Sequence, residues 1–131
     1  MSIIGKFDGD NLIATNAHVL TSETVVVKAG EKVSTMASVA IPRGTVLARN
    51  SADKFIVLGS DTGTAEVVAA TDIEEVSADT VAEVYNSGDF NGNALIAAEN
   101  YSITAGDVAD LKKAGVYVVN EVAPKIITFG V

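Results

Sequence analysis

Short runs of β-branched and aliphatic residues, separated by polar turn residues, recur along the chain. Val25 to Val27 are three consecutive valines, and Met36 to Ile41 is a second apolar stretch. Thr45 to Arg49 and Lys54 to Leu58 lie on either side of the polar residues Asn50 to Asp53. Two strand-like runs joined by such a polar turn are typical of a β-hairpin. The pattern therefore predicts four strands here, the last two of them paired.

The middle of the chain shows two further strand patterns. Ala65 to Ala70 follows the polar loop Gly59 to Gly63 and is almost continuously apolar, which is typical of a strand buried on both faces. Asp72 to Val76 could continue that strand. Val81 to Tyr85 alternates, so that Ala82 and Val84 face one side of a sheet and their neighbours the other.

One segment has the signals of a helix instead. Thr104 precedes Ala105, Gly106 and Asp107, which is a relaxed form of the capping box that begins many helices. Adjacent lysines suit the negative end of the helix dipole, and Gly115 is suited to the position just after a helix. We predict one short α-helix over residues 105–114.

Turn residues, a last strand and a C-terminal tail complete the expected order of elements. Ser87-Gly88 and Asn91-Gly92 are residue pairs that favour turns. Val116 to Val119 returns to the composition of a strand, and residues 120–131 form a tail that could add a final strand. The fold class expected from these patterns is all-β with one helix.

The first 24 residues read differently from the rest. They mix apolar pairs with Gly, Asn, Asp and Thr, and neither the helical nor the strand period persists across them. We interpret residues 1–24 as an extended N-terminal arm that becomes ordered against a partner, and residues 25–131 as a single β-rich domain. The alternative is that the same segment forms a first strand and turns of that domain.

Composition supports one small domain with a core of small side chains. The chain has 131 residues, of which 48% are hydrophobic but only 5% aromatic, with no Trp. This length is that of one domain. Val, Ala, Ile and Leu must therefore fill the core, and each buries a modest area. Such a protein gains stability from self-association, because association adds buried surface.

Charge and cysteine content exclude several partners and sites. The formal net charge is −8, and the nine basic residues are scattered, so neither nucleic acid nor an anionic membrane is an expected partner. The absence of Cys excludes disulfides and thiolate sites. No apolar run approaches the ~18 residues of a membrane span. The start of the chain lacks the pattern of a secretory signal, so we expect a protein that is made and used without export.

The residues that could carry catalysis do not form a recognisable set. His18 is the one histidine, and it falls in the expected arm, so we interpret it as a solvated or interface residue. Glu74 and Glu75 are adjacent, and neighbours in a strand point to opposite faces, so they are not expected to act as an acid–base pair.

The sequence also lacks a complete metal-binding or phosphate-binding motif. Asp89 to Asn93 has the spacing that begins a calcium-binding loop. The sixth position is Ala94 where Gly is required, and the twelfth is Asn100, which cannot supply a bidentate carboxylate. No glycine-rich phosphate loop is present either. We therefore expect no enzyme activity, no metal and no cofactor.

Four motifs occur in a fixed order in the central part of the chain. They are an R-G-T-V-L segment at Arg43 to Leu47, an aliphatic strand with an acidic end within Asp61 to Thr80, a G-x-F-N-x-x-A-L element at Gly88 to Leu95, and a capped helix that leads to G-V-Y within Ile103 to Tyr117. In this order they resemble the head decoration proteins of lambda-type tailed bacteriophages. The resemblance covers residues 44–117.

This resemblance implies a small β-clip-like domain and a structural role. It implies a homotrimer at local threefold positions on the outside of the expanded capsid, which stabilises the capsid against the pressure of packaged DNA. The partner would be the major capsid protein, and the location the virion, after synthesis in the host cytoplasm. The arm would bind the capsid through its apolar residues, which are Ile3, Ile4, Phe7, Leu12 and Ile13.

Two alternatives remain open at this stage. One is another non-enzymatic phage module, such as a structural or adhesive protein of the tail or fibre. The other is an enzyme or a small-ligand domain, which would need a pocket with converging polar groups.

Overall fold

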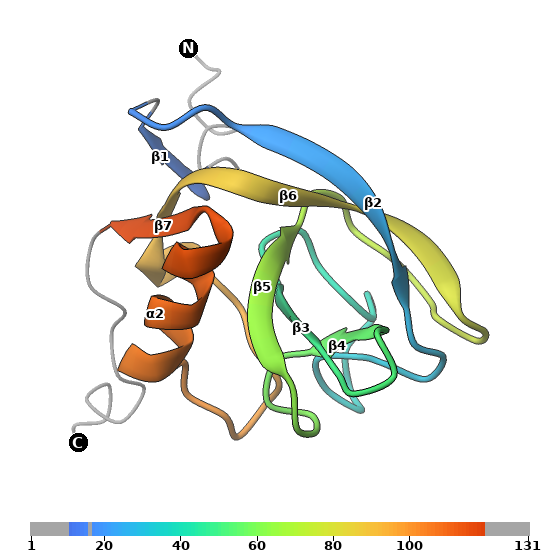
Figure 1. Cartoon of the computed structure of the whole chain (residues 1–131). Coiled ribbons are helices and arrows are strands. Elements are labelled where there is room, and N and C mark those ends of the chain that lie inside the picture. The colour runs from blue at the N-terminus through green and yellow to red at the C-terminus, as the bar shows by residue number, and fades with distance from the viewer. Residues whose placement is uncertain (1–10, 16, 120–131) are drawn as a thin grey trace, which may run out of the picture.

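The computed structural model describes residues 11–15 and 17–119 (Figure 1). This part of the chain contains seven strands, a short 3-10 helix and one α-helix. In chain order they are β1 (Ile13–Thr15), β2 (Thr21–Val27), β3 (Val46–Arg49), β4 (Phe55–Val57), β5 (Thr64–Ala69), β6 (Thr80–Asn91), η1 (Gly92–Ala94), α2 (Ala105–Ala114) and β7 (Val116–Val119). The fold is therefore mostly β with one helix, as the sequence predicts.

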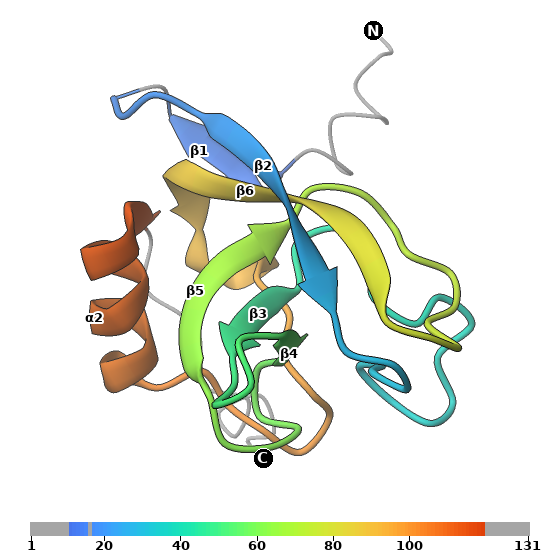
Figure 2. The same cartoon turned by 45° about the vertical axis from the view of Figure 1, so that its right-hand side comes forward.

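Five of the strands close into a mixed barrel. The hydrogen-bonded order runs from β6 through β2, β4 and β3 to β5, and β5 pairs again with β6. The contact between β2 and β4 is parallel and consists of Val27 opposite Phe55. Figure 2 shows β2 and β6 passing over the curved strands β3, β4 and β5. Closure leaves few unpaired edges within the barrel.

The long strand β6 also builds a second, smaller sheet. Its first part pairs with β2, whereas Gly88 to Asn91 pair with β7 on one side, and Phe90 and Asp89 pair with β1 on the other. The turn that Ser87-Gly88 predicts is therefore absent, and the strand continues. Gly88 has a φ of 138°, which a side chain would disfavour, and it allows the strand to bend where its partners change.

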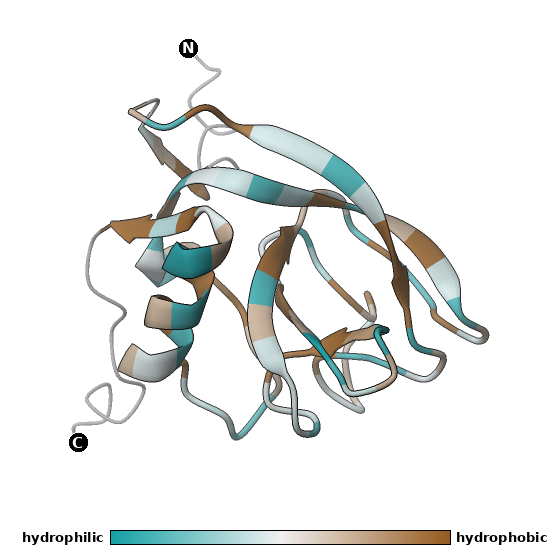
Figure 3. Cartoon of the chain, in the orientation of Figure 1, coloured by the Kyte–Doolittle hydropathy of each residue, from teal (hydrophilic) through white to brown (hydrophobic). Residues whose placement is uncertain are grey.

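Two groups of buried side chains make up the core. One fills the barrel and includes Val27, Leu47 and Val57. The other contains Phe90 of β6 and Leu111 of α2, which are completely buried, and it joins the helix to the barrel. Figure 3 shows hydrophobic residues in β5 and β7, and of these Val67, Val68 and Val116 are buried.

Several predicted elements are confirmed. The β3–β4 hairpin is antiparallel, with Leu47 opposite Val57. Ala82 and Val84 of β6 are buried, whereas Val81 and Glu83 are exposed. The helix α2 spans residues 105–114, with the Thr104 hydroxyl and the Asp107 carboxylate forming the complete capping box.

Two strand predictions are wrong. Met36 to Ile41 forms turns and bends, and only Ile41 makes an isolated antiparallel bridge, to Ile73. Asp72 to Val76 does not continue β5, because the chain leaves the barrel after Ala69. Both segments were predicted as strands because they are rich in apolar residues. Loop residues that are buried in the core, such as Ile41 and Val76, are apolar as well, so composition does not distinguish the two.

The N-terminal segment differs from the expected arm in its extent. Thr21 to Thr24 belong to β2 and pair with β6, and Ile13 to Thr15 form β1. Leu12 is 3% exposed and packs in the second core group. The described part of the segment is thus ordered within its own chain, which is nearer to the alternative of a first strand. The arm boundary at residue 24 is corrected accordingly, whereas residues 1–10 lie outside the described residues.

Candidate functional site

The five predicted capsid-binding residues fall into three groups. Ile3, Ile4 and Phe7 lie outside the described residues. Leu12 is buried in the body, where its methyl groups lie beside Gly44. Ile13 is partly buried in β1 and packs against the second core group. Leu12 therefore anchors the N-terminal segment to the domain and is not available to a partner.

Next to β1 the structure brings together three side chains that are distant in the sequence. The backbone N–H of His18 donates to Asp89 Oδ2 at 2.7 Å, and His18 Nδ1 lies 2.7 Å from Asp89 Oδ1. The imidazole also stacks on the Tyr117 ring, with centroids 3.8 Å apart and planes 12° apart. We call these three residues the His18 clasp. It ties the connection between β1 and β2 to both β6 and β7.

Electrostatics favour this arrangement. Asp89 is only 3% exposed, so an ionised carboxylate there needs hydrogen bonds. The side-chain hydrogen bond from His18 lowers the pKa of Asp89 against the effect of burial, and the His18 backbone and the Thr15 hydroxyl add to the lowering. A carboxylate only accepts hydrogen bonds, so the proton of the short contact lies on His18 Nδ1.

The clasp predicts a defined dependence of stability on acid. Because folding lowers the pKa of Asp89, its contribution to the free energy of unfolding is complete above the unfolded value of ~3.9 and disappears as pH falls through the folded value. Thermal melts from pH 7 to pH 2.5 should show Asp89→Asn destabilised at pH 7 but losing less stability than the wild type on acidification. Parallel curves for the two proteins would contradict this role.

Sequence reasoning missed the clasp. The sequence predicts that His18 is solvated or at an interface. Its side chain is indeed half exposed, but its Nδ1 atom is bound to Asp89. For Asp89 the sequence suggests only the first position of a calcium-binding loop. Both oxygens of this carboxylate are instead occupied by His18. No spacing in the sequence reveals a contact across 71 residues.

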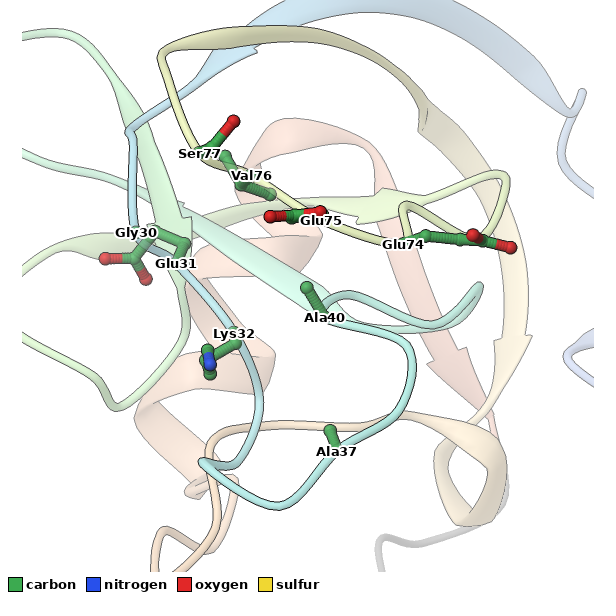
Figure 4. Close-up of a pocket in the computed structure, with 9 residues that line it drawn as sticks. All are labelled: Gly30, Glu31, Lys32, Ala37, Ala40, Glu74, Glu75, Val76 and Ser77. Carbon is green, nitrogen blue, oxygen red and sulfur yellow. The ribbon is translucent and has the colours of Figure 1, made fainter.

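A shallow pocket lies between the segments that follow β2 and β5 in the chain. It has a volume of about 240 Å³ and is lined from Gly30 to Lys32 and from Glu74 to Ser77. Figure 4 shows Glu74 and Glu75 pointing in different directions, although they lie in a loop and not in the strand from which this was predicted. The carboxylate of Glu31 accepts from the Val57 N–H and the Ser60 hydroxyl, both at 2.8 Å, so it is engaged in holding β4.

Metal and membrane features can be assessed for the same residues. Within residues 11–15 and 17–119, no three His, Asp or Glu side chains gather in a way that could hold a metal ion. In this described part, no helix has the length and apolar character needed to cross a membrane.

Comparison with known proteins gives the family. Residues 1–116 match the model of the family described as bacteriophage lambda head decoration protein D. Comparison with individual curated proteins gave no match. Head decoration proteins are structural, non-enzymatic proteins of the phage capsid surface, which they bind and stabilise. Because the match covers far more than half of its 131 residues, the chain belongs to the bacteriophage lambda head decoration protein D family.

Proposed function

We propose that this protein is a homotrimeric decoration protein that binds the major capsid protein at local threefold positions of the expanded capsid. The family match over residues 1–116 is the observation that supports this most. In this proposal the closed barrel is the β-clip-like body, and the bound trimer stabilises the capsid against the pressure of packaged DNA. Subunits would be made in the host cytoplasm and would act on the virion surface.

The N-terminal residues are the proposed capsid-binding arm. They enter the body through β1, which pairs with no described strand other than β6. A segment that leads into such an edge can add to a sheet of the partner, where backbone hydrogen bonds supply affinity. We assign the contact to Ile3, Ile4 and Phe7, with Ile13 at the base of the arm and Leu12 as its anchor.

Trimerisation strengthens such binding. Each arm alone would bind through a few apolar side chains. Once one arm of a trimer is bound, the other two find their sites at high effective concentration. A partner surface that exists only on the expanded capsid would make binding select and stabilise that state.

A direct test combines oligomeric state with capsid binding. Light scattering should give three times the monomer mass of 13.4 kDa at micromolar concentration. The protein should also co-sediment with expanded heads that lack decoration protein and should raise their resistance to heat. Unexpanded heads are the matched control and should bind little. A strict monomer, or equal binding to tails and heads, would contradict the proposal.

A further inference from the structure

Apart from Met36, the most exposed large apolar residues lie at the two ends of the β2–β6 ribbon. The large apolar residues with the most exposed side chains in the described structure are Val19 at 74%, Leu20 at 44%, Val26 at 40%, Met36 at 87% and Val81 at 66%. Val26 lies opposite Val81 at one end of the ribbon. Val19 and Leu20 lie at the other end, in the connection that the His18 clasp holds. Neighbouring exposed apolar residues often mark a binding surface, and of the two pairs only Val19 and Leu20 lie beside the His18 clasp and the residues that lead to the arm.

The position of Val19 and Leu20 is fixed by the clasp and by β6. His18, the preceding residue, is bound to Asp89 and stacked on Tyr117. A Cβ atom on Gly88 would lie 2.8 Å from a methyl carbon of Leu20, so this leucine rests directly on the glycine. The connection is therefore held in place before any partner arrives, which lowers the entropy that binding must overcome.

Both terminal segments leave the described structure near this place. The Asn91 N–H donates to the Leu12 carbonyl at 2.8 Å, and Asn91 is also the register partner of Val119. Leu12 and Val119, near the two ends of the described chain, therefore lie on either side of the end of β6. Asn91 is three residues from Gly88, or roughly 10 Å along a strand. A partner surface that lies against this end of β6 would also lie close to Val19 and Leu20.

Two basic side chains lie near this end of the molecule. The chain carries a net charge of −8, yet Lys112 and Lys113 are exposed in the last turn of α2. Neither lysine makes an ion pair with a residue in the described part of the chain. Gly115, which ends this helix, accepts a hydrogen bond from the Gly88 N–H at 3.2 Å. The basic helix end and Leu20 therefore lie beside the same glycine.

We propose that this end of the body is a second capsid contact, which adds to the arm. We call it the clasp face and define it by Val19, Leu20, Tyr117, Lys112 and Lys113. The partner is the outer surface of the capsid, with an apolar patch for the two aliphatic side chains and carboxylates opposite the two lysines. This inference rests on the proposed capsid-binding function, and it assigns part of the affinity to the folded body.

A pair of matched substitutions tests the clasp face. Val19→Asp places a charge on it, and Val81→Asp places the same charge on a valine of similar exposure, roughly 20 Å away along β6. Both proteins are purified in the oligomeric state of the wild type, and their affinity for expanded heads is measured by titration. Val19→Asp should bind about tenfold more weakly or worse, because a buried charge opposes association, and Val81→Asp should bind like the wild type.

Charge reversal at the two lysines is an independent test of the clasp face. Lys112→Glu/Lys113→Glu should weaken binding and reduce its dependence on salt, whereas Lys28→Glu/Lys32→Glu should change neither. Wild-type affinity of the Val19→Asp protein, or an equal loss in the Val19→Asp and Val81→Asp proteins, would overturn the clasp face. A wild-type protein that does not bind heads at all would instead overturn the proposed function, so the two failures are distinguishable.

Discussion

A protein that lacks residues 1–24 is expected to be unfolded at 25 °C, whereas one that lacks residues 1–10 should melt within about 2 °C of the full chain. The longer deletion removes β1, four residues of β2, the His18 clasp and Leu12. Loss of a buried leucine side chain such as that of Leu12 lowers the free energy of unfolding by about 2–5 kcal/mol. Because domains are typically stable by only about 5–15 kcal/mol, a barrel that keeps only Val25 to Val27 of β2 and lacks Leu12 should not persist.

The two deletions together separate the arm from the body. Circular dichroism and gel filtration report folding, and titration with expanded heads reports function. The protein without residues 1–10 should stay folded, keep the oligomeric state of the full chain and bind heads at least about a hundredfold more weakly, because its arms are absent. Undiminished binding would exclude the arm as the main contact. A folded and stable protein without residues 1–24 would show instead that the arm extends through β1.

The elements that were predicted correctly are those whose signal is local. The Thr104–Asp107 capping box and Gly115 define both ends of α2 within a dozen residues of sequence. The Asn50 side chain accepts from the Ala52 and Lys54 N–H groups and so forms the turn of the β3–β4 hairpin. In each of these cases the residues that decide the structure are close neighbours, so one sequence suffices.

The elements that were wrong depend on distant partners. Ser87-Gly88 has the composition of a turn, yet β2, β1 and β7 supply hydrogen bonds on both sides and keep β6 extended through it. Thr21 to Thr24 carry almost no apolar pattern and are exposed, so only pairing with β6 makes them a strand. Tertiary pairing overrides local propensity in both places.

The candidate site was the least predictable part for the same reason. Family resemblance pointed to the N-terminal segment, but not to the contact of His18 with Asp89 and Tyr117. The three residues are joined only when β1, β6 and β7 assemble into one sheet. Asp89 neighbours the core residue Phe90, so the alternation of a strand would place it on the opposite, solvent-facing side, and only His18 and Tyr117 from other segments make it a buried residue.

Phe90→Ala is expected to be the most destabilising single substitution in the end of the molecule that carries both terminal segments. Phe90 is fully buried and lies between Ile13 of β1 and Val118 of β7 in the sheet. Its ring centroid is 5.7 Å from that of Tyr85. Removal of the ring leaves a cavity, and such changes cost about 3–5 kcal/mol. The midpoint of thermal unfolding should fall by more than about 10 °C.

Where Phe90→Ala loses stability tells whether the two groups of buried residues unfold independently or together. Phe90 belongs to the group of buried residues that joins α2 and β7 to the barrel, not to the group inside the barrel. Hydrogen exchange in Phe90→Ala should therefore speed up first in β1, β7 and α2, while the amides of the β3–β4 hairpin stay protected. Val81→Ala, on the exposed face of the same strand, is the control and should change the free energy of unfolding by less than about 0.5 kcal/mol. Uniformly faster exchange across the described residues would show that the two groups unfold as one unit, and the end that presents the arm could then not open independently of the barrel.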